Sequence, residues 1–367
     1  MSEPVPVWSH SESEQPLRRA SSWKYTLALV AALVVGATGY FLYVKSQNPT
    51  PPPVDTLTSL KEYLSRLSEH QKLADGYDDT NKDLVADTPT DPAKWVKVDS
   101  ALMFSVVATD DPVQAAEQWR PLMAALSAAT GKNVKYADDV RTVEDQYTAV
   151  RDGRLHVTAF NTGAVPTAVN TAGFVPLFAP ADAQGKFGYE MEILVRADSP
   201  IQAPADLKGK TLGFVAMSSN SGAKAPMVVL KNEFHLAPGR DYQYAMTGDH
   251  VRSVKELIAG QHDAVCVAND LLHRAEAAGE VDKARYRSIY TSRPFPPLCF
   301  GVPHQLPPDL QAKVKAAFAA FKFDPATPVG KRFAVQGKTG FAPINYEKDW
   351  DFVRKIDETL SHLLDAK

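Results

Sequence analysis

The stretch that decides the fold runs from Thr211 to His235 and reads TLGFVAMSSNSGAKAPMVVLKNEFH. Its first residues predict a strand as far as Ala216, and the pattern after residue 220 predicts a helix that reaches His235. Pro226 fits such a helix only near its start, because proline lacks an N–H group and its ring blocks the preceding turn. The polar residues 217–222 therefore form a turn that leads from a strand into the first turn of a helix.

This polar turn is a candidate cradle for a small oxyanion. The free N–H groups at a helix N-terminus point in one direction and favour negative charge there. The hydroxyls of Ser219 and Ser221 and the amide of Asn220 would add neutral donors, and Gly222 would let a ligand approach the backbone closely. The alternative is an ordinary helix cap with spare serines.

Two more turns of the same kind supply further candidates. His250 follows a predicted strand at 242–245 and precedes a helix, which is where open α/β sheets bind ligands. Its imidazole could donate to an oxyanion, although a capping or surface role is the alternative. The third turn, at 158–163, would bring its backbone and Thr162 to the ligand from the opposite side.

Strand-like and helical patterns alternate from about Lys97 to the end of the chain. Such alternation predicts an α/β fold with largely parallel sheets, and about 270 residues of it predict two lobes. The expected strands are 102–107, 155–160, 192–197, 211–216, 263–268 and 298–302. The expected helices are 112–129, 143–151, 221–235, 251–259, 308–321 and 346–364.

The chain resembles the phosphate/phosphite/phosphonate-binding (PhnD-like) substrate-binding proteins of ABC transporters over roughly residues 100–345. The segments that carry the resemblance are 103–108, RDGRLHVTAF at 151–160, GY at 188–189, ILVRADSPI at 193–201, DLKGKT at 206–211, SNSG at 219–222, GDH at 248–250 and GQHDAV at 260–265. The resemblance implies a two-lobed type-2 periplasmic-binding fold whose lobes close on the ligand by hinge motion. It places lobe 1 at 96–195, lobe 2 at 196–290, and the return of lobe 1 with a C-terminal helix at 291–367.

The same resemblance assigns roles to the candidate residues. It implies that the turn residues Ser219–Ser221 and His250 bind the phosphorus oxyanion, that Phe160 and Thr162 face it from the other lobe, and that Tyr189 lies near the hinge. Where the family often has Ser-Thr-Ser in the cradle, this chain has Asn220 in the middle, which keeps a donor.

A second departure from the family concerns the ligand. Binders of aminoalkyl phosphonates carry an acidic residue after the second crossing between the lobes, where this chain reads PPLC at 296–299. Asp270 is the remaining candidate acid. The expected ligand is therefore phosphate, phosphite or a simple phosphonate, because every P–O or P–OH group left unpaired in the pocket would cost affinity.

The N-terminal part predicts one membrane anchor at 24–45. Thr26–Val44 reads TLALVAALVVGATGYFLYV and carries no charge, and a helix of this length spans roughly 28 Å. Because Arg18, Arg19 and Lys24 precede it, residues 1–23 are expected to form a disordered cytoplasmic tail, and the binding domain is expected to be periplasmic or extracellular. The alternative is a cleaved signal peptide, with a weak cleavage site at 37–39.

Residues 46–95 are interpreted as a Pro-rich and acidic stalk. It starts with a stiff spacer, SQNPTPPP, at 46–53, and the spacing of Leu57, Leu60, Leu64 and Leu67 then predicts a short amphipathic helix.

The acidic part of this segment is a candidate calcium site. Asp79, Asn81, Asp83 and Asp87 follow a D-x-N-x-D-x-x-x-D spacing, which suits oxygen ligation of Ca²⁺. Leu84 stands where an EF-hand loop has glycine, however, and the alternative is a solvated turn. No other cofactor is expected.

Composition limits the remaining functions. Lys and Arg together number 40 against 43 Asp and Glu, and a net charge of −3 gives no basic field for nucleic acid. With only two cysteines, Cys266 and Cys299, a disulfide scaffold is excluded; both are expected to be buried and unpaired, with a bridge between them left open.

No catalytic motif is recognisable, since the chain has no nucleophile elbow, no Walker A loop and no zinc-protease motif. The sequence thus predicts a non-enzymatic, membrane-anchored protein that delivers a phosphorus oxyanion to an ABC transporter permease. The alternative is a tethered sensor or accessory scaffold built on the same binding domain.

Overall fold

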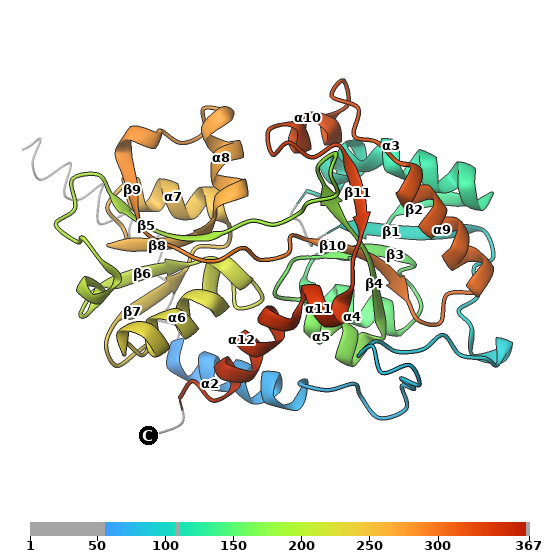
Figure 1. Ribbon diagram of the computed structural model, residues 1–367, viewed down its shortest axis with the longest axis horizontal. Coiled ribbons are helices and arrows are strands. Elements are labelled where there is room, and N and C mark those ends of the chain that lie inside the picture. The colour runs from blue at the N-terminus through green and yellow to red at the C-terminus, as the bar shows by residue number, and fades with distance from the viewer. Residues whose placement is uncertain (1–55, 107–110, 365–367) are drawn as a thin grey trace, which may run out of the picture. The chain divides into compact units, whose positions relative to one another are not determined.

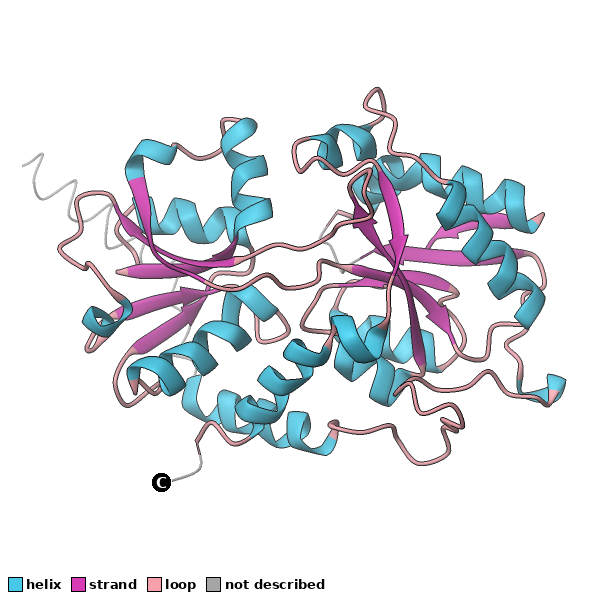
Figure 2. Cartoon of the chain, in the orientation of Figure 1, coloured by secondary structure: helices cyan, strands magenta, loops and turns pink. Residues whose placement is uncertain are grey.

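The computed structural model describes residues 56–106 and 111–364, and these belong to one compact unit, Asp55–Lys367. The unit contains two β-sheets, each covered by helices on both faces (Figures 1 and 2). Within the described residues no helix combines the length and apolar character that crossing a bilayer requires. The predicted anchor at 24–45 lies outside the described residues.

The first sheet has six strands in the order β11-β4-β10-β3-β1-β2. Their bounds are β1 Ala101–Val106, β2 Asn133–Tyr136, β3 Val157–Phe160, β4 Phe174–Ala181, β10 Cys299–Pro303 and β11 Gly340–Pro343. The accompanying helices are α3 Pro112–Thr130, α4 Val143–Arg151, α5 Val165–Ala172, α9 Pro308–Ala320, α10 Pro328–Ala334 and the short η1 Pro92–Lys94.

The second sheet has five strands in the order β7-β6-β8-β5-β9. Their bounds are β5 Met191–Arg196, β6 Thr211–Phe214, β7 Gln243–Met246, β8 Ala264–Ala268 and β9 Tyr286–Thr291. Its helical elements are α6 Ala225–Phe234, α7 His250–Ile258, α8 Asn269–Ala277, η2 Pro204–Leu207, η3 Asn220–Lys224 and η4 Lys283–Arg285.

Local sequence signals fix several helix ends. Asp111 accepts a hydrogen bond from the Gln114 N–H, and Pro112 occupies the first position of α3. The same helix ends at Gly131, whose φ of 69° is a left-handed conformation that glycine adopts readily. In α4, Thr142 and Asp145 form a reciprocal capping box. The expected bounds of these two helices are therefore met almost to the residue.

The chain crosses twice between the sheets, at 182–190 and 292–298 (Figure 1). The two crossings pair at one point, where the Tyr189 N–H donates to the Phe295 carbonyl at 3.0 Å and the Phe295 N–H donates back at 2.7 Å. The first crossing ends before the expected lobe boundary at 195/196. Strand β5 follows it and pairs with β8 and β9, so this strand belongs to the second sheet.

The expectation of largely parallel sheets is wrong. Of the nine pairings between the described strands, four are parallel and five are antiparallel. The crossings are the reason. After the first crossing β5 enters the second sheet, and after the second crossing β10 re-enters the first sheet. Each of these strands runs antiparallel to both of its neighbours. The result is a mixed α/β fold of two lobes, each built on one sheet.

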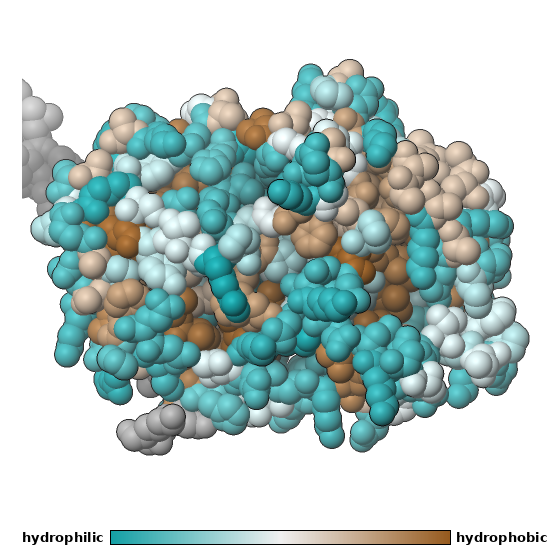
Figure 3. All heavy atoms as spheres, viewed as in Figure 1, coloured by the Kyte–Doolittle hydropathy of each residue, from teal (hydrophilic) through white to brown (hydrophobic). Residues whose placement is uncertain are grey.

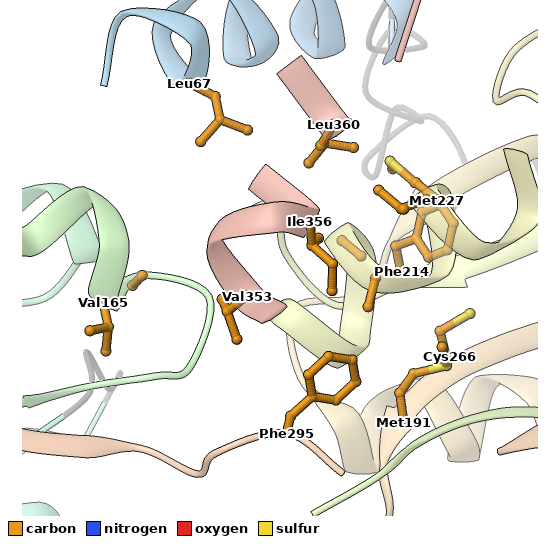
Figure 4. Packing of buried hydrophobic residues seen from close by; sticks show 14 of the residues in the cluster. Leu67, Val165, Met191, Phe214, Met227, Cys266, Phe295, Val353, Ile356 and Leu360 are labelled. Atoms are coloured by element: carbon orange, nitrogen blue, oxygen red, sulfur yellow. The ribbon is translucent and has the colours of Figure 1, made fainter. Parts of the chain in front are cut away.

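A third connection between the lobes is helical. It consists of α2 Thr56–Glu69, α11 Tyr346–Asp349 and α12 Asp351–Ser361. Leu60, Leu64 and Leu67 of α2 are buried in the same apolar cluster as Ile356 and Leu360 of α12 (Figure 4). The amphipathic helix expected from the leucine spacing is thus present, and it packs on α12.

The chain after α2 is attached to the first lobe. The Ala74 N–H donates to the Asn170 carbonyl of α5 at 2.8 Å, and the Asn170 side chain donates to the His70 carbonyl at the same distance. The described part of the expected stalk therefore lies against the two lobes.

Apolar side chains are gathered in three buried clusters, and hydrophilic residues dominate the face shown in Figure 3. Cys266 on β8 and Cys299 on β10 are both buried and free, as expected. Burial raises the pKa of both thiols, so they remain protonated at neutral pH.

Candidate functional site

One edge of the second sheet gathers most of the predicted site residues. Strands β7, β6 and β8 are parallel neighbours, so their carboxyl ends share an edge. The turn 217–222 follows β6, His250 follows β7 and Asp270 follows β8. Tyr189 precedes β5, which starts opposite the end of β8. The topology thus explains why residues far apart in sequence meet at this edge.

The first lobe contributes the turn after β3. There the Thr162 hydroxyl donates to the Pro296 carbonyl of the second crossing at 2.8 Å. The Trp350 indole, fully buried between α11 and α12, donates to the Thr162 carbonyl at 3.1 Å. These two bonds fix Thr162 at the junction of the lobes.

Thr162, Tyr189, Asn220 and Ser221 come together at this junction, and we call them the donor cluster. All four are at least nine-tenths buried. The Asn220 amide lies 3.4 Å from the Tyr189 hydroxyl. Burial raises the pKa of Tyr189, and the neighbouring side chains of Thr162, Asn220 and Ser221 oppose the rise. The cluster is therefore neutral at physiological pH and rich in hydrogen-bond donors.

Ser219 and Gly222 each have a structural role in the cradle turn, and their contact with a ligand stays a prediction. The Ser219 hydroxyl accepts from the Gly222 N–H at 3.0 Å and so acts as a helix cap, which was the alternative interpretation of this serine. A Cβ at Gly222 would lie 2.6 Å from the Val215 side chain. Packing against β6 accounts for this glycine, and close approach of a ligand is not needed to explain it.

The first turn of the cradle helix is a π-turn, η3, in which the Ala225 N–H donates to the Asn220 carbonyl. Such π-turns often occur at functional sites, because they shift the following residues out of the α-helical register. Asn220 and Ser221 are both buried, facing the junction, while the helix continues as α6.

A buried ion pair that sequence reasoning missed joins η3 to the rest of the junction. Lys224 Nζ donates to the Gly163 carbonyl at 2.6 Å and to Asp357 Oδ1 of α12 at 2.8 Å, and both charged side chains are at most 3% exposed. A Cβ at Gly163 would lie 2.6 Å from the Ser218 carbonyl, so the two lobes touch here through their backbones.

The sequence contains a signal for the burial of each of these two charged residues. Lys224 is a single charge between Ala223 and Ala225 in a stretch that is otherwise apolar. Asp357 is four residues after Val353, and so lies on the apolar face of its helix. A charge placed where a helix must be buried indicates a buried partner.

His250 is the first residue of α7 and lies beside the end of β8. Its Nδ1 accepts from the Ala268 N–H at 3.1 Å, and burial lowers the pKa of the ring to about 4. The imidazole is therefore neutral at pH 7, and its proton is on Nε2. Among the described residues no hydrogen bond or ion pair joins His250 to the donor cluster, so its role in binding stays a prediction.

Phe160 occupies a position that does not suit ligand contact through its side chain. It is fully buried, stacked on Tyr147 at 5.3 Å and edge-on to Phe174 at 4.9 Å between ring centroids. As the last residue of β3, it supports the turn that carries Thr162. We therefore assign its side chain to the core of the first lobe.

A cavity of about 460 Å³ adjoins the donor cluster. Tyr189 and Asp270 line it, together with residues of the first crossing, of α8 and of the loop between α10 and β11. Burial raises the pKa of Asp270, while Arg274, Arg332 and Lys338 oppose that rise. Space and charge are thus both available next to the cluster.

In the acidic loop of the predicted calcium site, the side-chain oxygens accept hydrogen bonds from the loop's own backbone N–H groups. Asp79 accepts from the N–H groups of Asp83 and Leu84, and Asn81 also accepts from Asp83. Asp87 accepts from the backbone and hydroxyl of Thr80. Across residues 56–106 and 111–364 no group of three or more His, Cys, Asp or Glu side chains could hold a metal ion. The geometry gives the calcium prediction no support.

A comparison with protein families finds one match, over residues 104–350. The matching family is described as "ABC transporter, phosphonate, periplasmic substrate-binding protein".

Solved structures resemble the same part of the chain. XAC2383 from Xanthomonas citri bound to ATP is 19% identical, with a TM-score of 0.60 over 73% of this chain and 100% of that one. A binding protein component of an ABC phosphonate transporter from Pseudomonas aeruginosa is 17% identical, with a TM-score of 0.59 over 72% and 89%. PhnD1 from Prochlorococcus marinus in complex with methylphosphonate is 13% identical, with a TM-score of 0.58 over 71% and 98%. At these identities the likeness establishes the two-lobed fold.

Proposed function

The chain belongs to the family of periplasmic phosphonate substrate-binding proteins of ABC transporters, and on this premise we propose that it captures a small phosphorus oxyanion for an ABC importer. The family is one of solute-binding proteins, so the expected activity is binding and release. Phosphate, phosphite and simple phosphonates are the candidate ligands, and a permease is the partner to which the loaded protein docks.

The donor cluster is the observation that carries this proposal. Thr162, Tyr189, Asn220 and Ser221 bring neutral hydroxyl and amide groups from both lobes and the hinge to one buried point. A phosphorus oxyanion offers several acceptor oxygens in a small volume, which matches such a set. Neutral donors also avoid burying a fixed cation when the ligand has left.

Binding in this arrangement requires motion. The Asn220 amide now faces the Tyr189 hydroxyl, and the Thr162 hydroxyl donates to the Pro296 carbonyl, so ligand oxygens must replace these bonds. The paired crossings at Tyr189 and Phe295 are the natural hinge, because both chains pass from one lobe to the other there. Opening at this hinge would admit the ligand, and closure would surround it as in other type-2 binding proteins.

We further propose that the uncharged segment at 24–45 anchors the chain in the membrane by a single helix, with residues 1–23 in the cytoplasm. The binding domain would then lie on the outer face of the membrane, next to its permease. This placement would make diffusion of a free binding protein unnecessary.

A thermal-shift titration of the full chain in mild detergent tests the binding proposal. At about 100 times the Kd, a ligand should stabilise the protein by about 2.7 kcal/mol and raise its melting temperature. At least one of phosphate, phosphite and methylphosphonate should give this rise, and sulfate at equal concentration should give less.

Variants locate the site. Ser221→Ala and His250→Ala should each reduce the ligand-induced shift, because each removes a proposed donor. Ser288→Ala, at an exposed position on β9, is the matched control and should leave the shift unchanged. If none of the three phosphorus compounds stabilises the full chain, the proposed function is wrong.

A further inference from the structure

The cavity beside the donor cluster is larger than a small phosphorus oxyanion needs. Methylphosphonate has five heavy atoms and fills at most about 150 Å³, if each atom takes a water molecule's share of volume. The cavity measures about 460 Å³ and opens next to Tyr189 of the cluster. Tyr189 is the cluster residue that also lines this cavity, so a ligand held at the cluster by its phosphorus group would reach past Tyr189 into space for a substituent of several further atoms.

The two carboxylates that line this cavity already have partners. The Gln336 amide donates to the Asp270 carbonyl at 3.2 Å and lies 3.4 Å from its carboxylate. Glu190 accepts from the Asn269 side chain at 3.2 Å. Each acid therefore already lies within hydrogen-bonding distance of an amide side chain.

Positive charge surrounds Asp270 on three sides. Arg274 of α8, Arg332 of α10 and Lys338 all act on this carboxylate. Arg332 lines a small adjoining cavity together with Asp270 and Lys338, and its buried Nε has no hydrogen-bond partner among the described residues. Glu280 also acts on Arg274, so three cations lie near two carboxylates here and positive charge remains in excess.

Lys338 places one of these positive charges at the wall of the cavity. Its Nζ donates to the Lys186 carbonyl on the first crossing at 3.3 Å, and both lysines line the cavity wall. Lys186 and Lys338 line this cavity together with Glu190 and Asp270, and the adjoining cavity adds Arg274 and Arg332, of which Arg274 also interacts with Glu280. An ammonium group entering here would meet cations, whereas an anionic group would be attracted.

We propose that the ligand carries, beyond its phosphorus oxyanion, a second anionic group on a short linker, and that the cavity holds this group near Lys338. The inference rests on the proposed function, because the donor cluster must hold the phosphorus end. It names the ligand class as bifunctional anions such as phosphonocarboxylates, and it disfavours aminoalkyl phosphonates.

Calorimetric titration of the full chain tests this with three probes: methylphosphonate, phosphonoacetate and 2-aminoethylphosphonate. Phosphonoacetate should bind more tightly than methylphosphonate, and 2-aminoethylphosphonate should bind least tightly. Lys338→Gln should weaken phosphonoacetate binding about three- to fivefold, the range of one partly solvated charge pair, and change methylphosphonate binding less than twofold. Lys331→Gln, an exposed lysine on α10 that does not line the cavity, is the matched control and should change neither.

The outcomes separate the two proposals. If methylphosphonate binds but phosphonoacetate binds no better, or if the aminoalkyl compound binds most tightly, the ligand class is wrong while the proposed function stands. Equal effects of Lys338→Gln on both anions would also overturn the role of the cavity. If none of these three compounds and neither phosphate nor phosphite binds, the proposed function itself fails.

Discussion

Removing one member of the buried Lys224–Asp357 pair should destabilise the protein strongly. In Asp357→Asn the Lys224 ammonium keeps its bond to the Gly163 carbonyl but loses its counter-charge, in a place where the side chain is 1% exposed. Burial already raises the pKa of Asp357 against the attraction of Lys224, which shows that desolvation of the pair is costly. Breaking such a pair typically costs about 3–5 kcal/mol, because an uncompensated charge stays buried.

Urea unfolding of the full chain, followed by circular dichroism, measures this cost. A loss of about 3–5 kcal/mol corresponds to a fall in melting temperature of roughly 5–8 °C for the unit Asp55–Lys367, at an unfolding entropy of about 2.1 cal/mol/K per residue. The control is the double variant Lys224→Met with Asp357→Leu, which removes both charges and keeps the volume; it should recover most of the loss.

The comparison also separates the pair's charge from its packing. If Asp357→Asn costs less than about 1 kcal/mol, the pair is solvated in solution and the geometry assigned to it is wrong. If the double variant is as unstable as the single one, packing rather than the uncompensated charge dominates. The exposed pair Lys355–Asp351 on the same helix is the reference, and Asp351→Asn there should cost under about 1 kcal/mol.

Three further predictions follow from the described residues. A chain that begins at residue 96 should be less stable than one that begins at residue 55, because it lacks Leu60, Leu64 and Leu67, whose burial contributes about 1.5–3 kcal/mol each; equal unfolding midpoints would show that α2 adds nothing. Burial lowers the pKa values of His156, His250 and His304 to about 4, from about 6.5 in the unfolded chain, so the unfolded state binds more protons between these pH values. The stability that these histidines contribute should therefore be complete above about pH 6.5 and fall towards pH 4. Equal unfolding midpoints at pH 7 and pH 5 would contradict this. The calcium prediction for Asp79–Asp87 requires that EDTA alter proteolysis near this loop, and identical digestion patterns would dismiss it.

Periodicity predicted the local elements well because local signals decide them. All six strands first expected from the sequence are present, and so is the short strand before His250. The strands that were missed, β2, β4, β9 and β11, are edge strands or contain proline. Phe174–Ala181 includes Pro176 and Pro180, which argue against a strand when read alone. Only pairing with β10 and β11 makes this segment a strand.

Sheet direction could not be predicted in the same way. Alternation of strands and helices is typical of parallel sheets, and it holds here for β1–β3 and for β6–β8. The antiparallel pairings arise where the chain leaves one lobe and returns from the other. That is a property of the whole path and leaves no mark on the period of any single segment.

The candidate site, too, could be predicted only in part from the sequence. Turn chemistry located Asn220 and Ser221, which face the junction, but it could not distinguish them from Ser219, whose hydroxyl closes the helix cap. Ser219 precedes the π-turn, whereas Asn220 and Ser221 lie within it and next to Tyr189. This turn also depends on contacts with distant parts of the chain. Gly163 has no side chain and so lets the backbone of the turn approach closely, and the Lys224–Asp357 pair ties the turn to α12. The sequence therefore predicts the candidate turn, whereas tertiary contacts decide which of its side chains face the junction between the lobes.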